Sequence, residues 1–194
     1  MMVIGLTGGI GMGKSTVARM FAARGIPSFN ADAAVHRLQA PNGRAIPLLA
    51  RAFPGTVRHC VLDRAKLRAL VVKDDHAMRR LELIMHPLVR QEEQRFRAAA
   101  HRAGRRAILL DIPLLFETHS ENRFDKIITV SAPRAAQLRR VLKRGLPRAQ
   151  IEAIIARQMP DAQKRRRADL IIATGLSKFH TLRAVRRAIP RILP

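Results

Sequence analysis

Length, composition and charge already narrow the class of this protein. The chain has 194 residues, 47% of them hydrophobic, which suits one domain with a small insertion. Its single cysteine, Cys60, excludes an internal disulfide, and no apolar stretch approaches the length of a membrane span. The 37 Lys and Arg residues exceed the 14 Asp and Glu residues, giving a net charge of +23, which favours polyanionic partners such as nucleic acid.

A glycine-rich loop between an expected strand (residues 2–7) and an expected helix (residues 16–24) is the most informative motif. It fits the pattern G-x-x-x-x-G-K-[ST] and consists of Gly8, Gly9, Ile10, Gly11, Met12, Gly13, Lys14, Ser15 and Thr16. Glycines let backbone N–H groups approach phosphate oxygens, and a helix N-terminus adds donors and a favourable dipole. Lys14 would lie near the β- and γ-phosphates, and the Ser15 hydroxyl would bind Mg²⁺. A chance match in a glycine-rich turn is the alternative, but the strand–loop–helix context favours binding of ATP or GTP with magnesium.

Asp32 follows a second expected strand, at residues 26–30, and stands where a helix begins. Ligands of open α/β sheets bind at the carboxyl ends of the strands, so Asp32 is a candidate ligand-binding acid. Capping of the following helix is the equally open alternative. His36, one turn further along, is either an ordinary helix residue near the site or a direct participant.

Residues 41–104 have a helical pattern and are expected to form an insertion between the second and third strands. Helices are predicted over 42–53, 64–72, 75–85 and 88–102, with Asp63 as a cap of the second. His86-Pro87 is predicted to separate the last two, because proline lacks an N–H and suits a first helical turn. Arg90 lies four residues after His86, across this predicted break; a plain helix junction with a solvated charge is the alternative.

An apolar run at 106–113 predicts a strand that is buried on both faces. Asp111 stands at its carboxyl end, where a P-loop enzyme places a second carboxylate on the magnesium side, unless the residue only shapes a turn. Glu117 follows shortly after.

The rest of the chain alternates strands with arginine-rich helices. Strands are predicted at 125–131 and 170–174, and helices at 135–144, 148–159 and after the candidate cap Ser177, while residues 161–169 hold the basic run Lys164-Arg165-Arg166-Arg167. Residues 133–167, here called the lid segment, suit a cover over phosphates because guanidinium groups pair phosphate oxygens bidentately. Five strands alternating with helices predict a three-layer α/β domain with a five-stranded parallel sheet.

Taken together, the motifs resemble the dephospho-CoA kinase family, which carries out the last step of coenzyme A biosynthesis. The resemblance covers nearly the whole chain and is carried by residues 5–16, Ala31-Asp32 with His36, His86-Pro87-Leu88-Val89-Arg90, residues 111–117, Gln158-Met159-Pro160 and Arg167-Ala168-Asp169. The glycine-rich loop alone is shared by many kinases, whereas the conjunction of these blocks is specific.

The resemblance implies a P-loop kinase fold of the nucleoside-monophosphate-kinase type and transfer of the ATP γ-phosphoryl group to the ribose 3′-hydroxyl of dephospho-CoA. It implies a core (1–40, 105–132 and 168–194), a CoA-binding insertion (41–104) and a lid (133–167). Asp32 matches the catalytic base, and Lys14, Arg140 and Thr7 lie beside the reacting groups; Arg144 matches a second arginine near ATP. The residues implied on the substrate side are Asp32, His36, His86, Arg90, Asp111 and Glu117, and those at the metal are Ser15 and Asp111.

The chain departs from the family pattern at three places. Asn30 replaces an acid before Asp32, the loop after Arg144 is one residue short, and Ala173 replaces an acid before the last helix. Three rival functions stay open: a nucleoside or nucleotide kinase, a nucleic-acid-binding ATPase suggested by the charge, and a nucleotide-binding protein without turnover. The absence of Trp and Tyr argues against a single-strand binder, although salt-sensitive nucleic-acid binding is expected as a secondary property. We expect a cytoplasmic monomer or small homo-oligomer.

Overall fold

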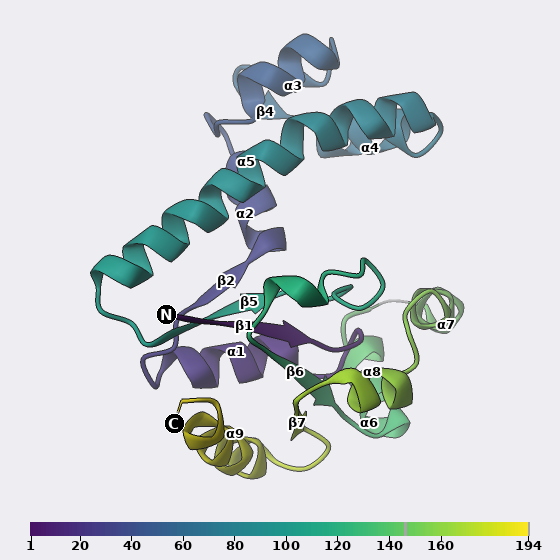
Figure 1. Ribbon diagram of the computed structural model, residues 1–194. Helices are drawn as coiled ribbons and strands as arrows, with labels where there is room; N and C mark the ends of the chain where they lie inside the picture. The colour runs from purple at the N-terminus through teal and green to yellow at the C-terminus, as the bar shows by residue number, and fades with distance from the viewer. Residues whose placement is uncertain (146, 194) are drawn as a thin grey trace. The chain divides into compact units, whose positions relative to one another are not determined.

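The structure is a computed structural model that describes residues 1–145 and 147–193, and its contacts divide the chain into two units (Figure 1). The α/β unit comprises Met1–Phe29 and Ala100–Pro194, and the helical unit comprises Asn30–Ala99. The helical unit thus begins before residue 41, where the predicted insertion starts; the functional boundaries of the insertion and the lid segment stay predictions. Leu146, which the sequence places in a turn, lies outside the described residues.

A five-stranded sheet organises the α/β unit. Its strands, in the order β2-β5-β1-β6-β7, are β1 (Met2–Thr7), β2 (Ser28–Asn30), β5 (Ala107–Asp111), β6 (Lys126–Ser131) and β7 (Leu170–Ala173). Its helices are α1 (Lys14–Ala22), α6 (Arg134–Leu142), α7 (Arg148–Ala156), α8 (Asp161–Arg167) and α9 (Lys178–Ile192), with a short 3₁₀ turn at Glu121–Arg123. β1 pairs in parallel with β5 and β6, and β6 pairs in parallel with β7, which confirms the predicted fold class.

The side chains of β6 show how the sheet separates two layers, because successive residues of a strand point to opposite faces. Ile128 and Val130 join the main core, which also holds buried residues of α1 and α9. Ile127 belongs to a second apolar cluster, and Thr129 donates from Oγ1 to the Lys164 carbonyl of α8. The sheet is therefore covered on both faces, as a three-layer domain requires.

The helical unit has an apolar core of its own. It contains α2 (Ala31–Leu38), α3 (Ile46–Ala52), α4 (Arg64–Val71), most of α5 (Asp75–Arg102) and a small antiparallel hairpin of β3 (Val57–Arg58) and β4 (Val61–Leu62). Leu38, Leu49, Leu67 and Met85 are buried in one cluster that draws on all four helices. Burial of these side chains stabilises the unit.

Two predictions for the helical unit are wrong. The hairpin was not expected; its turn residues His59 and Cys60 have φ of 48° and 60°, a conformation that sequence patterns rarely reveal outside glycine. The chain also does not break at Pro87, because α5 continues through it as one helix. Proline removes one helical N–H, but Met85 and Leu88 on either side are buried in the unit's core and hold the helix together.

Two predicted helix caps are confirmed. The Asp63 carboxylate accepts a hydrogen bond from Lys66 N at 3.0 Å at the start of α4. The Ser177 hydroxyl accepts from His180 N at 3.4 Å at the start of α9. Each satisfies an N–H group that the first helical turn leaves without a partner.

Candidate active site

The glycine-rich loop runs from the end of β1 to the start of α1, as the sequence predicts. Gly8 and Gly11 have φ of 147° and 75°, and a Cβ on them would lie 2.6 Å from Val130 O and 2.5 Å from Val141 Cγ2. Side chains at these two positions would clash with the neighbouring layers. The loop is thereby packed closely against its neighbours and leads directly into the N-terminus of α1, the end of a helix at which backbone N–H groups favour phosphate.

Lys14 and Asp111 form an ion pair at the end of this loop. Lys14 Nζ lies 2.5 Å from Asp111 Oδ1, and the two side chains are 14% and 2% exposed. Asp111 ends β5 and pairs in register with Leu6, so the sheet brings its carboxylate to the loop that follows β1. The sequence assigned both residues to the phosphate–magnesium region, and the structure brings them together; burial makes their mutual charge compensation strong.

Arg140 fastens the loop to the end of β7. Its Nη1 donates to Gly11 O at 3.3 Å and to Thr174 Oγ1 at 3.1 Å, and its Nη2 donates to Thr174 O. Thr174 Oγ1 in turn donates to Met12 O at 2.5 Å. Arg140 and Arg144 line a pocket of about 210 Å³ together with Gly11 and other residues of this loop and of the β7–α9 connection.

Thr7 and Glu117 lie in a second polar cluster, which anchors α8. Thr7 Oγ1 donates to Pro113 O at 3.1 Å, and Lys164 Nζ donates to the same carbonyl at 3.2 Å. Lys164 is only 1% exposed and forms an ion pair with Glu117 Oε1 at 2.8 Å, while Met159 N also donates to that oxygen at 2.8 Å. Glu117, implied on the substrate side by the resemblance, therefore has its Oε1 engaged with the lid segment.

The pKa of Glu117 lies below its ordinary value. Burial alone would raise it, but the hydrogen bond from Lys164, the Met159 N–H and the Lys164 charge together outweigh burial and favour the carboxylate. Glu117 Oε2 is buried and has no hydrogen-bond partner within residues 1–145 and 147–193, so among these residues the charge is held through Oε1.

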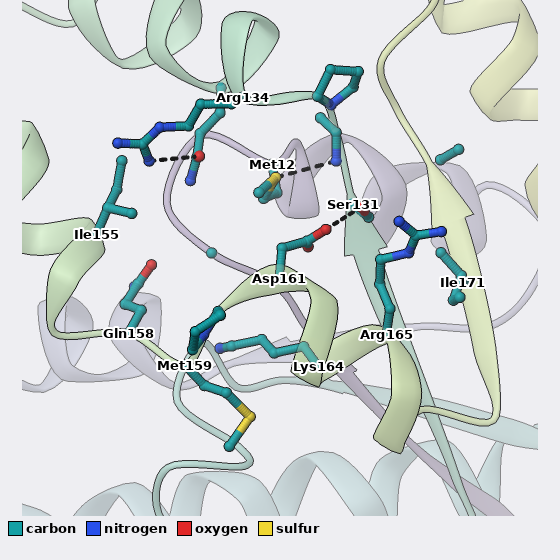
Figure 2. Close-up of a pocket in the computed structure, with 16 residues that line it drawn as sticks. Met12, Ser131, Arg134, Ile155, Gln158, Met159, Asp161, Lys164, Arg165 and Ile171 are labelled. Atoms are coloured by element: carbon teal, nitrogen blue, oxygen red, sulfur yellow. Dashed lines mark hydrogen bonds between the residues drawn. The ribbon is translucent and has the colours of Figure 1, made fainter.

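A larger pocket of about 520 Å³ lies between the glycine-rich loop, the end of β6 and the lid segment (Figure 2). Met12, Ile155 and Met159 give it apolar walls, and Arg134 and Asp161 are among its polar residues. Figure 2 shows Asp161 turned toward Ser131, whose hydroxyl donates to Asp161 Oδ2 at 2.7 Å.

Ile10 of the loop is contacted by two glutamines of the lid segment. Its N–H donates to Gln158 Oε1 at 3.0 Å, and its carbonyl accepts from Gln137 Nε2 at 2.8 Å. The lid segment thus contacts the phosphate-binding loop directly.

Four predicted substrate-side residues belong to the helical unit. Asp32 is exposed in the first turn of α2, and Asn30, not Asp32, is the N-cap, because its side chain accepts from Ala33 N at 2.7 Å. The capping alternative for Asp32 is therefore wrong, and its carboxylate is open to solvent. His36 Nδ1 lies 2.8 Å from Arg64 Nη1.

His86 and Arg90 are both exposed on α5, which is continuous between them. Residues four apart are neighbours on a helix surface, so the two side chains share one face. Leu83 lies on the same face and is 76% exposed.

Sequence reasoning missed two sets of polar residues. Gln137, Gln158 and Thr174 hold the loop in place, and Lys164 anchors α8 to Pro113 and Glu117. In the sequence, Gln158 stands out only as part of a family block, and Lys164 is one charge in a basic run. A buried lysine has no local signal, because its partners Glu117 and Pro113 are distant in sequence.

Two features are absent from residues 1–145 and 147–193. None of their helices is both long enough and apolar enough to cross a bilayer. No group of three or more His, Cys, Asp and Glu residues is arranged to hold a metal ion.

The chain is similar to known proteins along its whole length. The family model for dephospho-CoA kinase matches residues 2–177. The dephospho-CoA kinase of Brucella melitensis biotype 1 is 50% identical over 184 residues, covering 94% of this chain and 90% of the relative. That of Bradyrhizobium diazoefficiens is 48% identical over 194 residues, covering 100% of this chain and 94% of the relative.

Solved structures share the fold of this chain. A crystal structure from Thermus thermophilus superposes with a TM-score of 0.84 at 34% identity, covering 100% of this chain and 98% of that one. The dephospho-CoA kinase of Campylobacter jejuni (TM-score 0.65, 23% identity, 98% and 96% coverage) and a shikimate kinase of Acinetobacter baumannii (0.54, 16%, 100% and 93%) share the fold. With the glycine-rich loop, the Lys14–Asp111 pair and the arginine-bearing lid segment in place, the chain belongs to the dephospho-CoA kinase family.

Proposed function

We propose that this protein transfers the γ-phosphoryl group of ATP to the 3′-hydroxyl of the ribose of dephospho-CoA, forming coenzyme A and ADP. The observation that supports the proposal most directly is the Lys14–Asp111 ion pair beside the glycine-rich loop, which leads into the N-terminus of α1. Family membership at 50% identity over 94% of the chain supports the choice of acceptor. We place the enzyme in the cytoplasm, which its single cysteine and its use of ATP fit.

The α/β unit supplies the phosphate side of the reaction. Phosphoryl transfer depends on positioning and on stabilising charge on the equatorial oxygens, since the transition state is largely dissociative. Lys14 provides a cation at the loop, and Arg140 and Arg144 provide two more in the adjoining pocket. These cations neutralise charge that develops on the transferred group and on ADP.

The helical unit supplies the acceptor side. Asp32 presents an exposed carboxylate, which can accept the proton of an attacking hydroxyl. His36, His86 and Arg90 bind the anionic and polar groups of dephospho-CoA in this proposal. The exposure of His86 and Arg90 on one face of α5 supports that role.

The residues present fit a magnesium ion that enters with ATP. Mg²⁺ is usually held by one or two protein oxygens, substrate phosphates and water. Ser15 offers an exposed hydroxyl in the first turn of α1, and Asp111 offers a buried carboxylate at the end of β5. When bound, the ion adds positive charge at the β- and γ-phosphates.

A coupled assay of ADP release tests this function against its rivals. The acceptors are dephospho-CoA, adenosine, AMP, CMP, shikimate and none, each with ATP and Mg²⁺. We expect rapid release with dephospho-CoA alone, loss of release with excess EDTA, and a product phosphorylated at the 3′-hydroxyl by ³¹P NMR. Release that prefers AMP, CMP or shikimate would overturn the choice of acceptor.

A second proposed property is salt-sensitive binding of nucleic acid, which the net charge of +23 suggests and the kinase reaction does not need. The charge is uneven: the α/β unit has 24 Lys and Arg against 7 Asp and Glu, and the helical unit has 13 against 7. No acidic residue follows Asp169.

The outer face of α9 concentrates this charge. The other face of α9 is buried through Thr181, Val185, Ala188 and Ile192. The exposed basic residues of the helix are Lys178, Arg183, Arg186, Arg187 and Arg191, and the structure records no ion pair for them within the described residues. Such a row of cations suits a phosphate backbone, which attracts it without regard to sequence.

Fluorescence anisotropy with a labelled RNA duplex at 50–200 mM salt tests this property. Changing Arg183, Arg186, Arg187 and Arg191 to Gln should weaken binding and reduce the slope of log K against log salt by roughly one unit for each phosphate that the variant no longer neutralises. The matched control changes Arg51, Arg58, Arg68 and Arg79, exposed on the helical unit, to Gln. Equal losses of affinity in both variants, or binding to anionic vesicles but not to RNA, would overturn the assignment of this face.

A further inference from the structure

Both backbone polar groups of Ile10 are held by glutamines of the lid segment, and we infer that Gln137 and Gln158 are positioning residues for ATP. Gln158 accepts the Ile10 N–H at 3.0 Å, and Gln137 donates to the Ile10 carbonyl at 2.8 Å. The inference rests on the proposed kinase function and names residues that none of the motifs assigned to the reaction.

The backbone partners decide which end of each amide faces the loop. An N–H can only donate, so Gln158 must present its oxygen; a carbonyl can only accept, so Gln137 must present its nitrogen. The remaining oxygen of Gln137 accepts from Arg134 Nη1 at 3.1 Å, which agrees with that orientation. Gln137 is 3% exposed, so removing either of its hydrogen bonds would leave a buried group unsatisfied.

The two glutamines connect the loop to different parts of the lid segment. Gln137 lies in α6, and Gln158 follows α7. Arg134, which holds Gln137, also forms an ion pair with Glu152 of α7. Figure 2 shows Gln158 and Arg134 among the residues that line the larger pocket, which Met12 of the loop also lines.

Gly9 gives independent support for this arrangement. A Cβ at position 9 would lie 3.1 Å from Gln158 Oε1 and 3.4 Å from Gln137 Nε2, so both glutamines pack over this residue. A side chain there would press on the two amides at once.

The consequence concerns the orientation of the next donor. In a trans peptide the C=O and the following N–H point in opposite directions. Gln137 holds the Ile10 carbonyl and therefore directs the Gly11 N–H away from itself. A shift of α6 alters this donor, and a shift of the Gln158 segment alters the Gly9–Ile10 peptide, so the position of the lid segment sets how well the loop receives phosphate.

Substitutions of equal length separate the two roles. Glutamate can accept but not donate when ionised, and methionine offers neither function at full strength. At position 158, Gln158→Glu should stay near wild type while Gln158→Met raises the ATP KM by about 3- to 10-fold, the effect of one neutral hydrogen bond. At position 137, Gln137→Glu should be no better than Gln137→Met. The negative charge of the introduced glutamate is compensated, because Arg134, Lys164 and Arg165 line the same pocket.

The measurement is steady-state kinetics, with ATP and dephospho-CoA varied separately, together with the thermal unfolding temperature of each variant. A positioning role predicts a changed ATP KM and kcat, an unchanged dephospho-CoA KM, and no correlation with stability. Gln163, exposed on α8, provides the matched control Gln163→Met. Equal behaviour of Glu and Met at both positions, or wild-type kinetics in all four variants, would overturn the inference, whereas an inactive wild type would instead reject the proposed function.

Discussion

The predicted site residues of the two units differ in how the protein holds them. In the α/β unit, Lys14, Arg140 and Thr7 each make defined polar contacts with neighbouring elements. In the helical unit, Asp32 and Arg90 are exposed on helix surfaces. In the reaction proposed above, Lys14, Arg140 and Thr7 are therefore held by the fold before ATP binds, whereas the exposed side chains of Asp32 and Arg90 would be ordered by the acceptor.

This difference suggests a division of work. Groups that stabilise charge act best when they are fixed in advance, because they then need no reorganisation during the reaction. Groups that select an acceptor gain specificity from the contacts that they make with it when it binds. Variants in the α/β unit should therefore affect ATP use, and variants in the helical unit should affect dephospho-CoA use.

The largest expected effect follows removal of the Lys14 charge. Lys14→Met should lower turnover by roughly 10³–10⁵-fold, the range for a cation that stabilises the transferred phosphoryl group. It also leaves Asp111 buried without its partner cation, so the protein should unfold at a lower temperature. Adding Asp111→Asn should restore the unfolding temperature without restoring turnover, which calorimetry and the ADP assay measure; recovery of both would show that Lys14 acts only in stability.

The next effect concerns the proposed base. Asp32→Asn should lower kcat by roughly 10²–10⁴-fold, the usual contribution of a positioned acid–base group, with the ATP KM unchanged. The exposed position of Asp32 predicts an unfolding temperature close to that of the native chain. Normal kcat in this variant would remove Asp32 from the chemistry, and Asp32→Glu provides a comparison that keeps the charge.

A smaller effect is expected on the acceptor side. Arg90→Ala should raise the KM for dephospho-CoA by roughly 10- to 150-fold, since a hydrogen bond to a charged group is worth roughly 1.5–3 kcal/mol. The KM for ATP should not change. Arg95→Ala is the control, because Arg95 is also exposed on α5 and forms only a surface pair with Glu92. Equal effects of the two variants would point to a general loss of charge.

The smallest effect is on stability against acid. The pKa of Glu117 is lowered in the folded protein, so its stabilising contribution is complete above the ordinary glutamate range and is lost as the pH falls through the lower folded value. Unfolding temperatures between roughly pH 3 and 7 should fall on acidification in the native chain and fall less in Glu117→Gln. At neutral pH Glu117→Gln should cost roughly 2 kcal/mol, because Lys164 loses its ionised partner. Parallel pH profiles would place the acid sensitivity elsewhere.

Particular residues show what the sequence could and could not predict. The alternation of apolar runs with helical patterns predicted the sheet and placed Asp111 at the end of a buried strand, because both signals are local. The continuous helix through Pro87 was missed, since the burial of Met85 and Leu88 that offsets the proline depends on tertiary contacts. The cap at Asn30 was missed because Asp32, two residues later, is an equally good candidate on sequence grounds.

Local sequence patterns also could not predict the partners of Lys164 and of the two glutamines, because these contacts depend on the tertiary fold. Lys164 lies in a run of four basic residues, and only the fold reveals that this one turns inward to Glu117 while its neighbours stay exposed. Gln137 lies more than a hundred residues from Ile10, so no spacing could join them.

The division of work between the two units is tested most directly by binding without turnover. Calorimetric titration of a non-hydrolysable ATP analogue and of dephospho-CoA into Lys14→Met and Arg90→Ala gives four affinities. We expect a crossed result, in which Lys14→Met loses affinity for the analogue alone and Arg90→Ala loses affinity for dephospho-CoA alone. If Arg90→Ala binds dephospho-CoA as tightly as the native chain, or if Lys14→Met weakens the binding of both ligands equally, the two units do not divide the work in this way.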